Sequence, residues 1–358
     1  MQRRRIVAVR TGSEASDARS KVPNDEEVRR CKITISIIRP QIGGGGVPIQ
    51  TLVTGGAGFI GSTLIDALLA AGHHVEVVDN LSTGTLENLE NATTYGSAFT
   101  FTETDIREDA LTEVVVRRKP EVVIHLAAQI SVAASMDDPA SDAEINILGT
   151  LRVLEAAHLA GTRKLLFATS AAIYGDVPER DLPIAESQAH YPLSPYGISK
   201  SVALSYLEAT RERYGVEWCA LALANVYGPR QSSAGEAGVV ARFVDHLQRG
   251  EQPTIFGDGE QQRDFLFVDD AVDAFLLAMN NGDGLVLNIG TGRSVSVNEL
   301  WRSLADAAQS DLAPIYAPRR EGDLQASRLD SALAKTTLGW SAKTSLREGL
   351  ERIVNPQI

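Results

Sequence analysis

The sequence predicts an α/β protein built on a doubly wound parallel sheet and followed by a smaller C-terminal domain. From Ile49 onward, short apolar strands alternate with amphipathic helices, which is the pattern of a parallel sheet covered on both faces. The chain has 358 residues, more than one hydrophobic core usually organises, so a second domain is expected. After Val226 the elements become shorter and richer in Gly and Pro. We therefore assign residues 49–225 to the first domain and residues 226–358 mainly to the second, with some segments returning to the first.

Six strands are expected in the first domain, each a short apolar run. They lie near residues 49–54, 74–79, 99–102, 121–127, 164–169 and 217–224. Two of the intervening helices are marked by apolar residues at helical spacing, which we assign to the core. These residues are Leu64, Leu68 and Leu69 in one helix and Ile147, Leu151 and Leu154 in the other.

Residues 1–48 differ in composition from the rest of the chain. They contain three consecutive arginines at 3–5, a mixed charged run and four consecutive glycines at 43–46. A targeting role is disfavoured because no apolar core follows the arginines and acidic residues are present. We expect an N-terminal extension that is disordered and separate from the fold.

Overall composition limits the partners of the protein. The net charge of −12 disfavours nucleic acid and anionic membrane, because both require a basic face. Cys31 and Cys219 are the only cysteines, which gives neither a disulfide framework nor metal-ligand spacing and suits a cytoplasmic protein. No apolar run approaches the roughly 18 residues of a spanning helix, so we expect no membrane-spanning segment. For the reasons of charge and cysteine spacing given above, we also expect no nucleic-acid partner and no metal site.

The stretch Thr54-Gly-Gly-Ala-Gly-Phe-Ile-Gly61 connects the first predicted strand to the first helix. In a turn of this kind Gly55 can take a positive φ, Gly58 lets the backbone approach a pyrophosphate, and Gly61 allows close packing of helix on strand. The N-terminus of the helix then favours an anion, since its N–H groups are unpaired and the helix dipole is positive there. The turn predicts a Rossmann-like dinucleotide site.

Asp79 supports the dinucleotide prediction. It ends the apolar run 74–78 and lies 18 residues after Gly61, near the roughly 20 expected for a ribose-binding acid. Its carboxylate can accept both ribose hydroxyls and would repel a 2′-phosphate. Asn80-Leu81 offers no arginine to neutralise such a phosphate, so NAD is favoured over NADP. The alternative is that Asp79 only caps a turn before Ser82.

Tyr196 and Lys200 lie four residues apart in a helical run, and therefore on one face of the helix. A nearby ammonium and a cationic nicotinamide would both favour the phenolate form of Tyr196 and so lower its pKa. Ser170 ends the predicted strand 164–169, at the edge of the sheet that faces the cofactor. Together the three side chains could exchange a proton with a sugar hydroxyl. Taken singly, Tyr196 and Lys200 could be surface residues, and Ser170 could satisfy a turn.

At this point the sequence resembles the extended short-chain dehydrogenase/reductase superfamily, and within it the NAD-dependent nucleotide-sugar epimerases typified by UDP-glucose 4-epimerase. The resemblance covers about Ile49 to the C-terminus. Its motifs are Thr54-Gly-Gly-Ala-Gly-Phe-Ile-Gly61, Val78-Asp-Asn-Leu-Ser-Thr-Gly84, Asp105-Ile106, His125-Leu-Ala-Ala128, Asn146 with Gly149-Thr150, Ser170-Ala-Ala-Ile-Tyr-Gly175, Tyr196 to Lys200, and Asn225-Val-Tyr-Gly-Pro-Arg230.

The resemblance implies two sets of binding residues. For NAD these are Gly55, Gly58, Phe59, Ile60, Gly61, Asp79, Asn80, Asp105 and Ile106, with Leu126, Ala127, Ala128, Asn146, Tyr196 and Lys200 nearer the nicotinamide. For a UDP-sugar they are Ser170, Asn225, Arg263, Arg320 and Ser327. The two arginines would supply the local positive charge that a diphosphate requires, although Arg263 could instead form a surface ion pair. One departure is Ile130, where some family members place a lysine near the nicotinamide.

The reaction implied by the resemblance is reversible C4 inversion of a UDP-hexose. Tyr196 would remove the 4-hydroxyl proton while hydride passes from C4 to NAD, and hydride would return to the opposite face of the 4-keto sugar. The sugar pair would be UDP-glucose and UDP-galactose, with the N-acetylated pair also admitted if Ser327 occupies the position where stricter members carry tyrosine. The resemblance also implies a homodimer formed by the helices near 146–160 and 195–213.

Three alternatives stay open. UDP-glucuronate 4-epimerases share the scaffold. The 4,6-dehydratases and the UDP-glucuronate decarboxylases typically carry an acid just after the Ser/Thr, whereas this chain has Ala171 and Ala172, which cannot move a proton. A silent NAD-binding sensor is disfavoured because Ser170, Tyr196 and Lys200 are all present.

Overall fold

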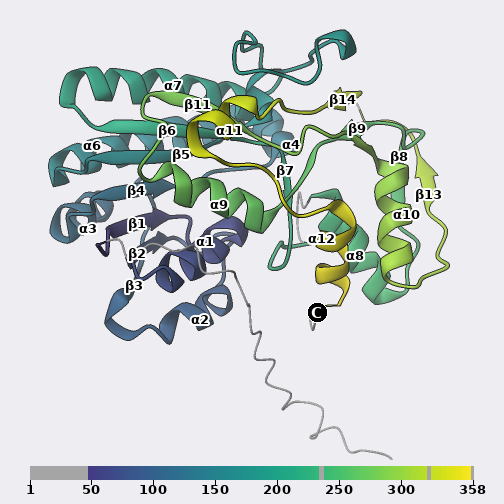
Figure 1. Cartoon of the computed structure of the whole chain (residues 1–358), viewed down its shortest axis with the longest axis horizontal. Coiled ribbons are helices and arrows are strands. Elements are labelled where there is room, and N and C mark those ends of the chain that lie inside the picture. Colours follow the sequence, from purple (N-terminus) through teal and green to yellow (C-terminus); the bar gives the residue numbers. More distant parts are fainter. Residues whose placement is uncertain (1–46, 234–237, 321–323, 356–358) are drawn as a thin grey trace, which may run out of the picture. The chain divides into compact units, whose positions relative to one another are not determined.

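The computed structural model describes residues 47–233, 238–320 and 324–355. In these residues a seven-stranded parallel sheet forms the centre of the fold (Figure 1). Its strands are β1 (Gln50–Thr54), β2 (His74–Asp79), β3 (Phe99–Glu103), β4 (Val122–His125), β5 (Lys164–Ser170), β6 (Glu217–Leu223) and β11 (Leu285–Ile289). They lie in the order β11-β6-β5-β4-β1-β2-β3, and every neighbouring pair is parallel. The predicted α/β fold class is confirmed.

The six strands predicted from the sequence all form, with ends that differ by at most two residues from the prediction. The seventh strand, β11, was not predicted, because its apolar run lies among short turns in the range assigned mainly to the smaller domain. β11 pairs with β6 along its whole length, so this later segment returns to the main sheet. The predicted extension, residues 1–48, lies outside the described residues apart from Val47 and Pro48.

Helices cover both faces of the sheet. The helices α1 (Phe59–Ala70) and α9 (Val268–Ala278) pack on one face, and α3 (Asp109–Arg118), α6 (Thr150–Ala160) and α7 (Pro195–Tyr214) pack on the other. Adjacent strand residues supply opposite cores: Val53 of β1 packs with α1, whereas Leu52 packs with α3 and α6. This alternation follows from the period of two along a strand. It produces a doubly wound sheet.

Short elements complete the loops of this unit. Between β2 and β3 lie η1 (Leu86–Leu89), α2 (Glu90–Thr93) and η2 (Gly96–Ala98). After β4 come α4 (Val132–Asp137), α5 (Pro139–Ala143) and the π-helical turn η3 (Glu144–Gly149), which continues into α6. After β5 come η4 (Ala171–Ile173) and η5 (Glu179–Asp181). Within the described ranges, no helix combines the length and the apolar character needed to cross a membrane.

The later part of the chain adds helices and three small sheets. The helices are α8 (Val239–Arg249), α10 (Val297–Ala307), α11 (Ala332–Leu338) and α12 (Leu346–Val354). In the small sheets β7 (Asn225–Tyr227) pairs with β10 (Phe265–Phe267), β9 (Gln262–Arg263) lies between β12 (Val295–Ser296) and β14 (Ala326–Ser327), and β8 (Thr254–Phe256) pairs with β13 (Ile315–Ala317). Figure 1 shows α8, α10 and α12 grouped on one side of the main sheet.

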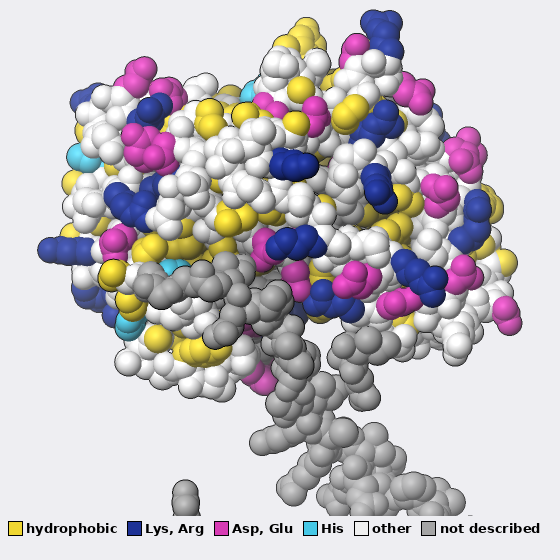
Figure 2. Space-filling model, viewed as in Figure 1, with side chains coloured by type: hydrophobic (Ala, Val, Ile, Leu, Met, Phe, Trp, Pro, Cys, Tyr) yellow, Lys and Arg dark blue, Asp and Glu magenta, His cyan; other side chains and the backbone are white. Residues whose placement is uncertain are grey.

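Charged side chains of both signs are interspersed on the face seen in Figure 2. The net charge of −12 is therefore not gathered into one acidic patch on that face. A mixed surface of this kind provides no extended positive field for a polyanion.

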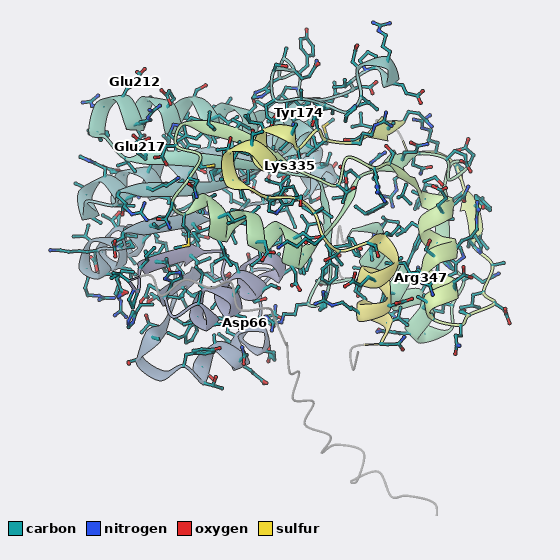
Figure 3. All side chains as sticks on the ribbon, in the orientation of Figure 1. Asp66, Tyr174, Glu212, Glu217, Lys335 and Arg347 are labelled. Atoms are coloured by element: carbon teal, nitrogen blue, oxygen red, sulfur yellow. The ribbon has the colours of Figure 1, made fainter. Side chains whose placement is uncertain are left out.

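An ion pair between Asp66 and Arg230 connects α1 to the segment that follows β7. Asp66 of α1, labelled in Figure 3, accepts hydrogen bonds from Arg230 Nη2 at 2.7 Å and from Asn91 Nδ2 at 2.8 Å. Asp66 is 8% exposed, and Arg230 has a positive φ of 69°, a strained conformation for a residue other than glycine. Loss of the carboxylate would leave the Arg230 charge largely uncompensated.

We predict that Asp66→Asn lowers the free energy of unfolding by about 3 kcal/mol, because one partner of a mostly buried pair is removed. Urea unfolding followed by circular dichroism would measure the change. The control is Arg347→Ala, which removes an exposed i,i+4 pair with Glu351 (Figure 3) and should leave the unfolding midpoint unchanged. Equal effects of the two substitutions would contradict the structural role given to Asp66.

Candidate active site

The glycine turn between β1 and α1 has the geometry of an anion-binding loop. Gly55 has a φ of +71°, and a Cβ there would lie 2.6 Å from the backbone nitrogen of Ala127. A Cβ on Gly61 would lie 2.2 Å from the carbonyl oxygen of Gly55. Gly58 is the N-cap of α1, and the first turn of the helix has no acidic side chain. The turn therefore presents helical N–H groups at the carboxyl end of β1, without a carboxylate to compete for them.

Phe59 and Ile60 form the start of α1, directly after this cap, and both are partly exposed. At the start of a helix, the backbone N–H groups of Phe59 and Ile60 are available to an anion. The side chains of these two residues pack against the core on the α1 side of the sheet. The predicted contacts of Phe59 and Ile60 thus lie at the start of the helix.

Asp79 lies beside the glycine turn at the end of β2. Its Oδ2 accepts a hydrogen bond from the N–H of Ala57 at 2.9 Å, and its Oδ1 accepts one from the N–H of Leu81 at 2.8 Å. A carboxylate has about four acceptor positions, so capacity remains for two hydroxyl groups. Leu81 has a φ of +56°, which is unusual for a residue other than glycine and typical of functional loops.

Asp105 and Asn80 meet at the next loop along the same edge. Asn80 Nδ2 donates to Asp105 Oδ2 at 2.7 Å, and the guanidinium of Arg107 donates to both carboxylate oxygens at 2.9 Å. The hydrogen bonds from Arg107 hold the pKa of Asp105 at about 2. Ile106 is buried against Gly149, where a Cβ would lie 2.6 Å from its Cδ1. Asp105 is thus an ionised acceptor at this end of the site.

Leu126, Ala127 and Ala128 follow β4 and lie next to the glycine turn. Leu126 N–H donates to the carbonyl of Thr54 at 3.1 Å, and Ala127 N–H donates to Thr54 Oγ1 at 3.3 Å. The three residues are partly exposed, so this loop forms an accessible wall. Beneath it, His125 is buried between the hydroxyls of Thr54 and Thr150, and burial lowers its pKa to about 3. His125 is therefore a neutral packing residue.

Asn146 lies behind this wall rather than on its surface. Its amide makes a reciprocal pair with the backbone of Gln129, with two hydrogen bonds of 2.9 Å. Its Nδ2 also donates to Asp142 Oδ1 at 2.9 Å and to Ser199 Oγ at 3.3 Å. The two N–H donors of an amide are thereby occupied. The geometry gives Asn146 a role in holding the loop, and a direct contact with a cofactor stays a prediction.

Tyr196 and Ser170 meet at the start of α7. Ser194 caps this helix by accepting from Gly197 N–H at 3.1 Å, and Pro195 occupies its first turn, which fixes Tyr196 in that turn. Ser170, the last residue of β5, accepts from Ala172 N–H at 3.2 Å, and its hydroxyl lies close enough to Tyr196 to lower the pKa of the phenol. The structure therefore brings the predicted serine and tyrosine together at the carboxyl end of β5.

Lys200 lies one turn further along α7 and is buried. Its Nζ donates to the carbonyl of Ala168 at 3.0 Å and lies 4.8 Å from the centre of the Phe167 ring. Burial lowers the pKa of Lys200 to about 8, while the charge of Asp142 raises it. Lys200 is thus an ammonium whose proton is weakly held near neutral pH.

The protonation of Tyr196 differs from the expectation of a lowered pKa. Burial raises the pKa of Tyr196, the Ser170 hydrogen bond lowers it, and the charge of Asp142 raises it further. Desolvation of a phenolate outweighs the favourable groups because the charged form loses its hydration. The protein alone therefore keeps Tyr196 protonated.

Three predicted substrate residues lie near Asp264, whose carboxylate is buried, through its backbone and its neighbour in the chain. Asp264 accepts from Thr291 N–H at 2.9 Å, from Thr291 Oγ1 at 2.6 Å, from Gly292 N–H at 3.1 Å and from Leu329 N–H at 3.2 Å. Its carbonyl accepts from Asn225 N–H at 2.9 Å. Arg263 precedes it in β9 and is the register partner of Ser327 in β14. Asn225, Arg263 and Ser327 are thus assembled by backbone pairing.

Arg263 and Arg320 are held by different contacts. Arg263 Nη1 donates to the carbonyls of Gln262 and Leu324, each at 2.8 Å. The guanidinium of Arg320 lies 3.9 Å from the centre of the Phe256 ring. Arg320 is exposed, so a cation and an aromatic ring are available side by side.

Sequence reasoning missed four residues at the site: Gln129, Asp142, Arg107 and Asp264. Gln129, Asp142 and Asp264 act through burial or through tertiary contacts, for which a single sequence has no signal. Arg107 alone could have been suspected, because it follows Asp105 by two residues. Among the described residues, no group of three His, Cys, Asp or Glu side chains could hold a metal ion.

Comparisons with known proteins agree with this geometry. The model of the NAD dependent epimerase/dehydratase family matches residues 51–290. A UDP-glucose 4-epimerase of Mycolicibacterium smegmatis is 46% identical over 308 residues, which cover 86% of this chain and 97% of the relative. The crystal structure of a UDP-glucose 4-epimerase of Thermotoga maritima with UDP-glucose is 47% identical, with a TM-score of 0.81 and coverage of 85% of this chain and 97% of that one. A Thermus thermophilus UDP-glucose 4-epimerase in complex with NAD is 39% identical, with a TM-score of 0.79 and the same coverage.

Proposed function

This chain belongs to the NAD-dependent epimerase/dehydratase family, and from that premise we propose that it interconverts UDP-glucose and UDP-galactose by inverting C4 of the sugar. The observation that carries the proposal is that Ser170, at the carboxyl end of β5, lies close enough to Tyr196 to lower the pKa of the phenol, with Lys200 one helical turn further along α7. Such a set can move a proton on and off one hydroxyl at the place where a hydride acceptor binds.

The residues present fit NAD. The N-terminus of α1 has no acidic side chain in its first turn, which leaves its N–H groups for a pyrophosphate. Asp79 uses one hydrogen bond on each oxygen and has capacity for the two hydroxyls of an unphosphorylated ribose. Asp105 at the adenine end is ionised, and its carboxylate already accepts four hydrogen bonds from Asn80 and Arg107, so its role is to order this loop. Bound NAD supplies a reversible hydride acceptor for C4.

Tyr196 would take the proton of the 4-hydroxyl and, after the 4-keto sugar has turned over in the site, would return a proton to the same oxygen while hydride returns to the opposite face of C4. Its raised pKa keeps the phenol protonated in the protein alone, and a cationic group bound beside it would shift the balance toward phenolate, the form that can accept a proton. Ser170 holds the sugar oxygen in line with the phenol. Lys200 supplies positive charge close to the oxygen that becomes anionic.

The diphosphate would be held by Arg263 and Arg320, with Asn225 as a neutral donor. Arg263 is preoriented by the carbonyls of Gln262 and Leu324, so little side-chain freedom is lost when it binds an anion. The guanidinium of Arg320 is stacked over the ring of Phe256, which would hold its charge in place for the diphosphate.

The small residues after Ser170 support epimerisation over elimination. Ala171 and Ala172 form the turn η4, and neither carries a group that could protonate or deprotonate a neighbouring sugar carbon. A dehydratase or a decarboxylase would need such a group here. We therefore assign the chain to C4 inversion.

The test is a panel of nucleotide sugars incubated with purified protein and trace NAD. UDP-glucose, UDP-galactose, their N-acetylated counterparts and UDP-glucuronate would be separated from their products by anion-exchange chromatography. An equilibrium pair of 4-epimers from UDP-glucose supports the proposal. A keto-deoxy sugar or a pentose as the product would overturn it.

We predict that Tyr196→Phe abolishes turnover and leaves NAD bound, because the ring still packs but cannot exchange a proton. Lys200→Ala should be comparably damaging and should also weaken NAD retention. Ser170→Ala should lose about 10²-fold in kcat, as expected for a positioning hydroxyl. Initial rates and the cofactor content of each variant would be measured together. Wild-type turnover in the Tyr196 variant would refute this mechanism.

We also propose a homodimer formed through α6 and α7. Exposed apolar side chains lie on η3, α6 and α7, and two of these elements are long helices packed against each other. These side chains are Leu148, Leu159, Ile198, Tyr206 and Tyr214. Exposed apolar faces of this kind are typical of interfaces between copies.

We also propose that the enzyme is located in the cytoplasm, because the two cysteines of the sequence suit a reducing compartment. Cell fractionation against a cytosolic marker would check this location.

The homodimer predicts twice the chain mass in size-exclusion chromatography with light scattering. Tyr206→Glu should shift the protein toward the monomer, because a charge would be buried in the interface. A wild-type protein that elutes as a monomer at micromolar concentration would reject the proposal.

Ser327 suggests that the sugar pocket is open on one side. It is the register partner of Arg263, so its side chain lies on the same face of the small sheet as the proposed diphosphate contact. A serine leaves room that a tyrosine would fill. We therefore propose that UDP-N-acetylglucosamine and UDP-N-acetylgalactosamine are accepted as well.

Ser327→Tyr is expected to reduce turnover of the acetylated pair by roughly 10-fold or more and to spare UDP-glucose, because overlap with the acetyl group costs on the order of 1–3 kcal/mol. The ratio of kcat/KM values for the two sugars measures the effect. Ser327→Thr, which adds only a methyl group, is the matched control. Equal losses on both sugars, or no acetylated activity in the wild type, would show that position 327 does not control the pocket.

A further inference from the structure

Asp142 is a buried carboxylate close to the catalytic residues that the mechanism above does not use. It lies in α5 and is 1% exposed, whereas the neighbouring acids Asp137, Asp138 and Glu144 are exposed. Burial of a carboxylate is costly unless the charge is paired and hydrogen-bonded. The surroundings of Asp142 therefore have to supply both.

The hydrogen bonds of Asp142 come from two amides. Its Oδ1 accepts from Asn146 Nδ2 at 2.9 Å and from Gln129 Nε2 at 3.0 Å. Asn146 in turn pairs with both backbone groups of Gln129, and the Gln129 side chain bonds to both backbone groups of Ser131. One carboxylate thus orients the two amides that shape residues 129–131, directly after Ala127 and Ala128.

The same cluster reaches the catalytic helix. Asn146 Nδ2 lies 3.3 Å from Ser199 Oγ, and Ser199 Oγ donates to the carbonyl of Tyr196 at 2.9 Å. Asn146 lies in the π-helical turn η3, and π turns within helices are frequent at functional sites. Asp142 is therefore connected through Asn146 and Ser199 to the turn of α7 that carries Tyr196 and Lys200.

Asp142 also favours the protonated, charged form of Lys200. The contacts of Lys200 Nζ are a carbonyl oxygen and an aromatic face, neither of which carries a full negative charge. Burial lowers the pKa of Lys200, and the charge of Asp142 opposes that shift. Of the other ionisable groups around this cluster, His125 has a pKa of about 3 and is neutral, and Asp137 of α4 and Glu144 of η3 are exposed to solvent. Tyr196 experiences the same charge, which raises its pKa.

We propose that Asp142 is a positioning residue of the epimerase reaction, a role that rests on the proposed function. Its carboxylate orients Asn146 and Gln129 and keeps the Lys200 ammonium charged beside Tyr196. Asp142 acts through these neighbours and is not assigned a contact with the substrate.

The test is Asp142→Asn, with Asp137→Asn as the matched control. Asparagine has the shape of aspartate, and its amide oxygen can still accept from Asn146 and Gln129, so the melting temperature should stay close to that of the wild type. Removal of a negative charge lowers the pKa of every nearby group. We therefore expect the pH profile of kcat/KM to move to lower pH by on the order of one unit, with about 5-fold less activity at pH 8. Asp137→Asn removes an exposed charge and should keep the wild-type profile.

A second readout does not require turnover. The affinity of the protein for NAD, measured by calorimetry across pH after removal of co-purified cofactor, should decline as Lys200 loses its proton. The midpoint of that decline should fall in Asp142→Asn and should not change in Asp137→Asn. A wild type without epimerase activity would overturn the proposed function, and this titration would still decide the role of Asp142.

A wild-type pH profile and NAD midpoint in Asp142→Asn would overturn the proposal, as would a loss of melting temperature alone. Asp142→Glu covers the case in which the asparagine variant does not fold. Glutamate keeps the charge in the same pocket, so the wild-type midpoint should be retained even at a lower melting temperature. A folded glutamate variant whose midpoint moves like that of a neutral residue would refute the charge role.

Discussion

The parallel register of β1, β4 and β5 is the constraint on which the site depends. Thr54 of β1 is the register partner of His125 in β4, and His125 is the partner of Phe167 in β5. Because the three strands run in one direction, their carboxyl ends deliver three loops to one edge of the sheet. The glycine turn, the 126–128 wall and Ser170 are therefore neighbours, although they lie far apart in the sequence. An antiparallel strand among them would carry its loop to the opposite edge.

The main features of the fold could be predicted from the sequence because each rests on local pattern. Apolar runs of strand length and glycines at fixed spacing located six strands and the dinucleotide turn. The strand β11 could not be found in the same way, since its pairing with β6 brings together residues more than 60 positions apart. Local pattern does not report which short apolar run joins which sheet.

The sequence could place Ser170 and Tyr196 at the same edge of the sheet, but it could not predict the electrostatics of these groups. Ser170 lies close enough to Tyr196 to lower its pKa, yet burial of the phenol has the larger effect and raises that pKa in the protein alone. Asp142 and Asp264 organise the site, but the sequence alone does not distinguish them from exposed acidic residues. Their burial follows from tertiary packing, and so do the donors that compensate each charge. Sequence identifies the reactive groups, whereas solvation decides their protonation.

The pairing of β9 with β14 has a consequence for how this protein could diverge. Arg263, which we propose binds the diphosphate, and Ser327, which we propose lines the sugar pocket, are register partners in two paired strands. The ladder itself is held by main-chain hydrogen bonds, to which the side chain at 327 contributes nothing. A single substitution at residue 327 during evolution could therefore change the sugar preference. Binding of the nucleotide and the stability of the small sheet would not change.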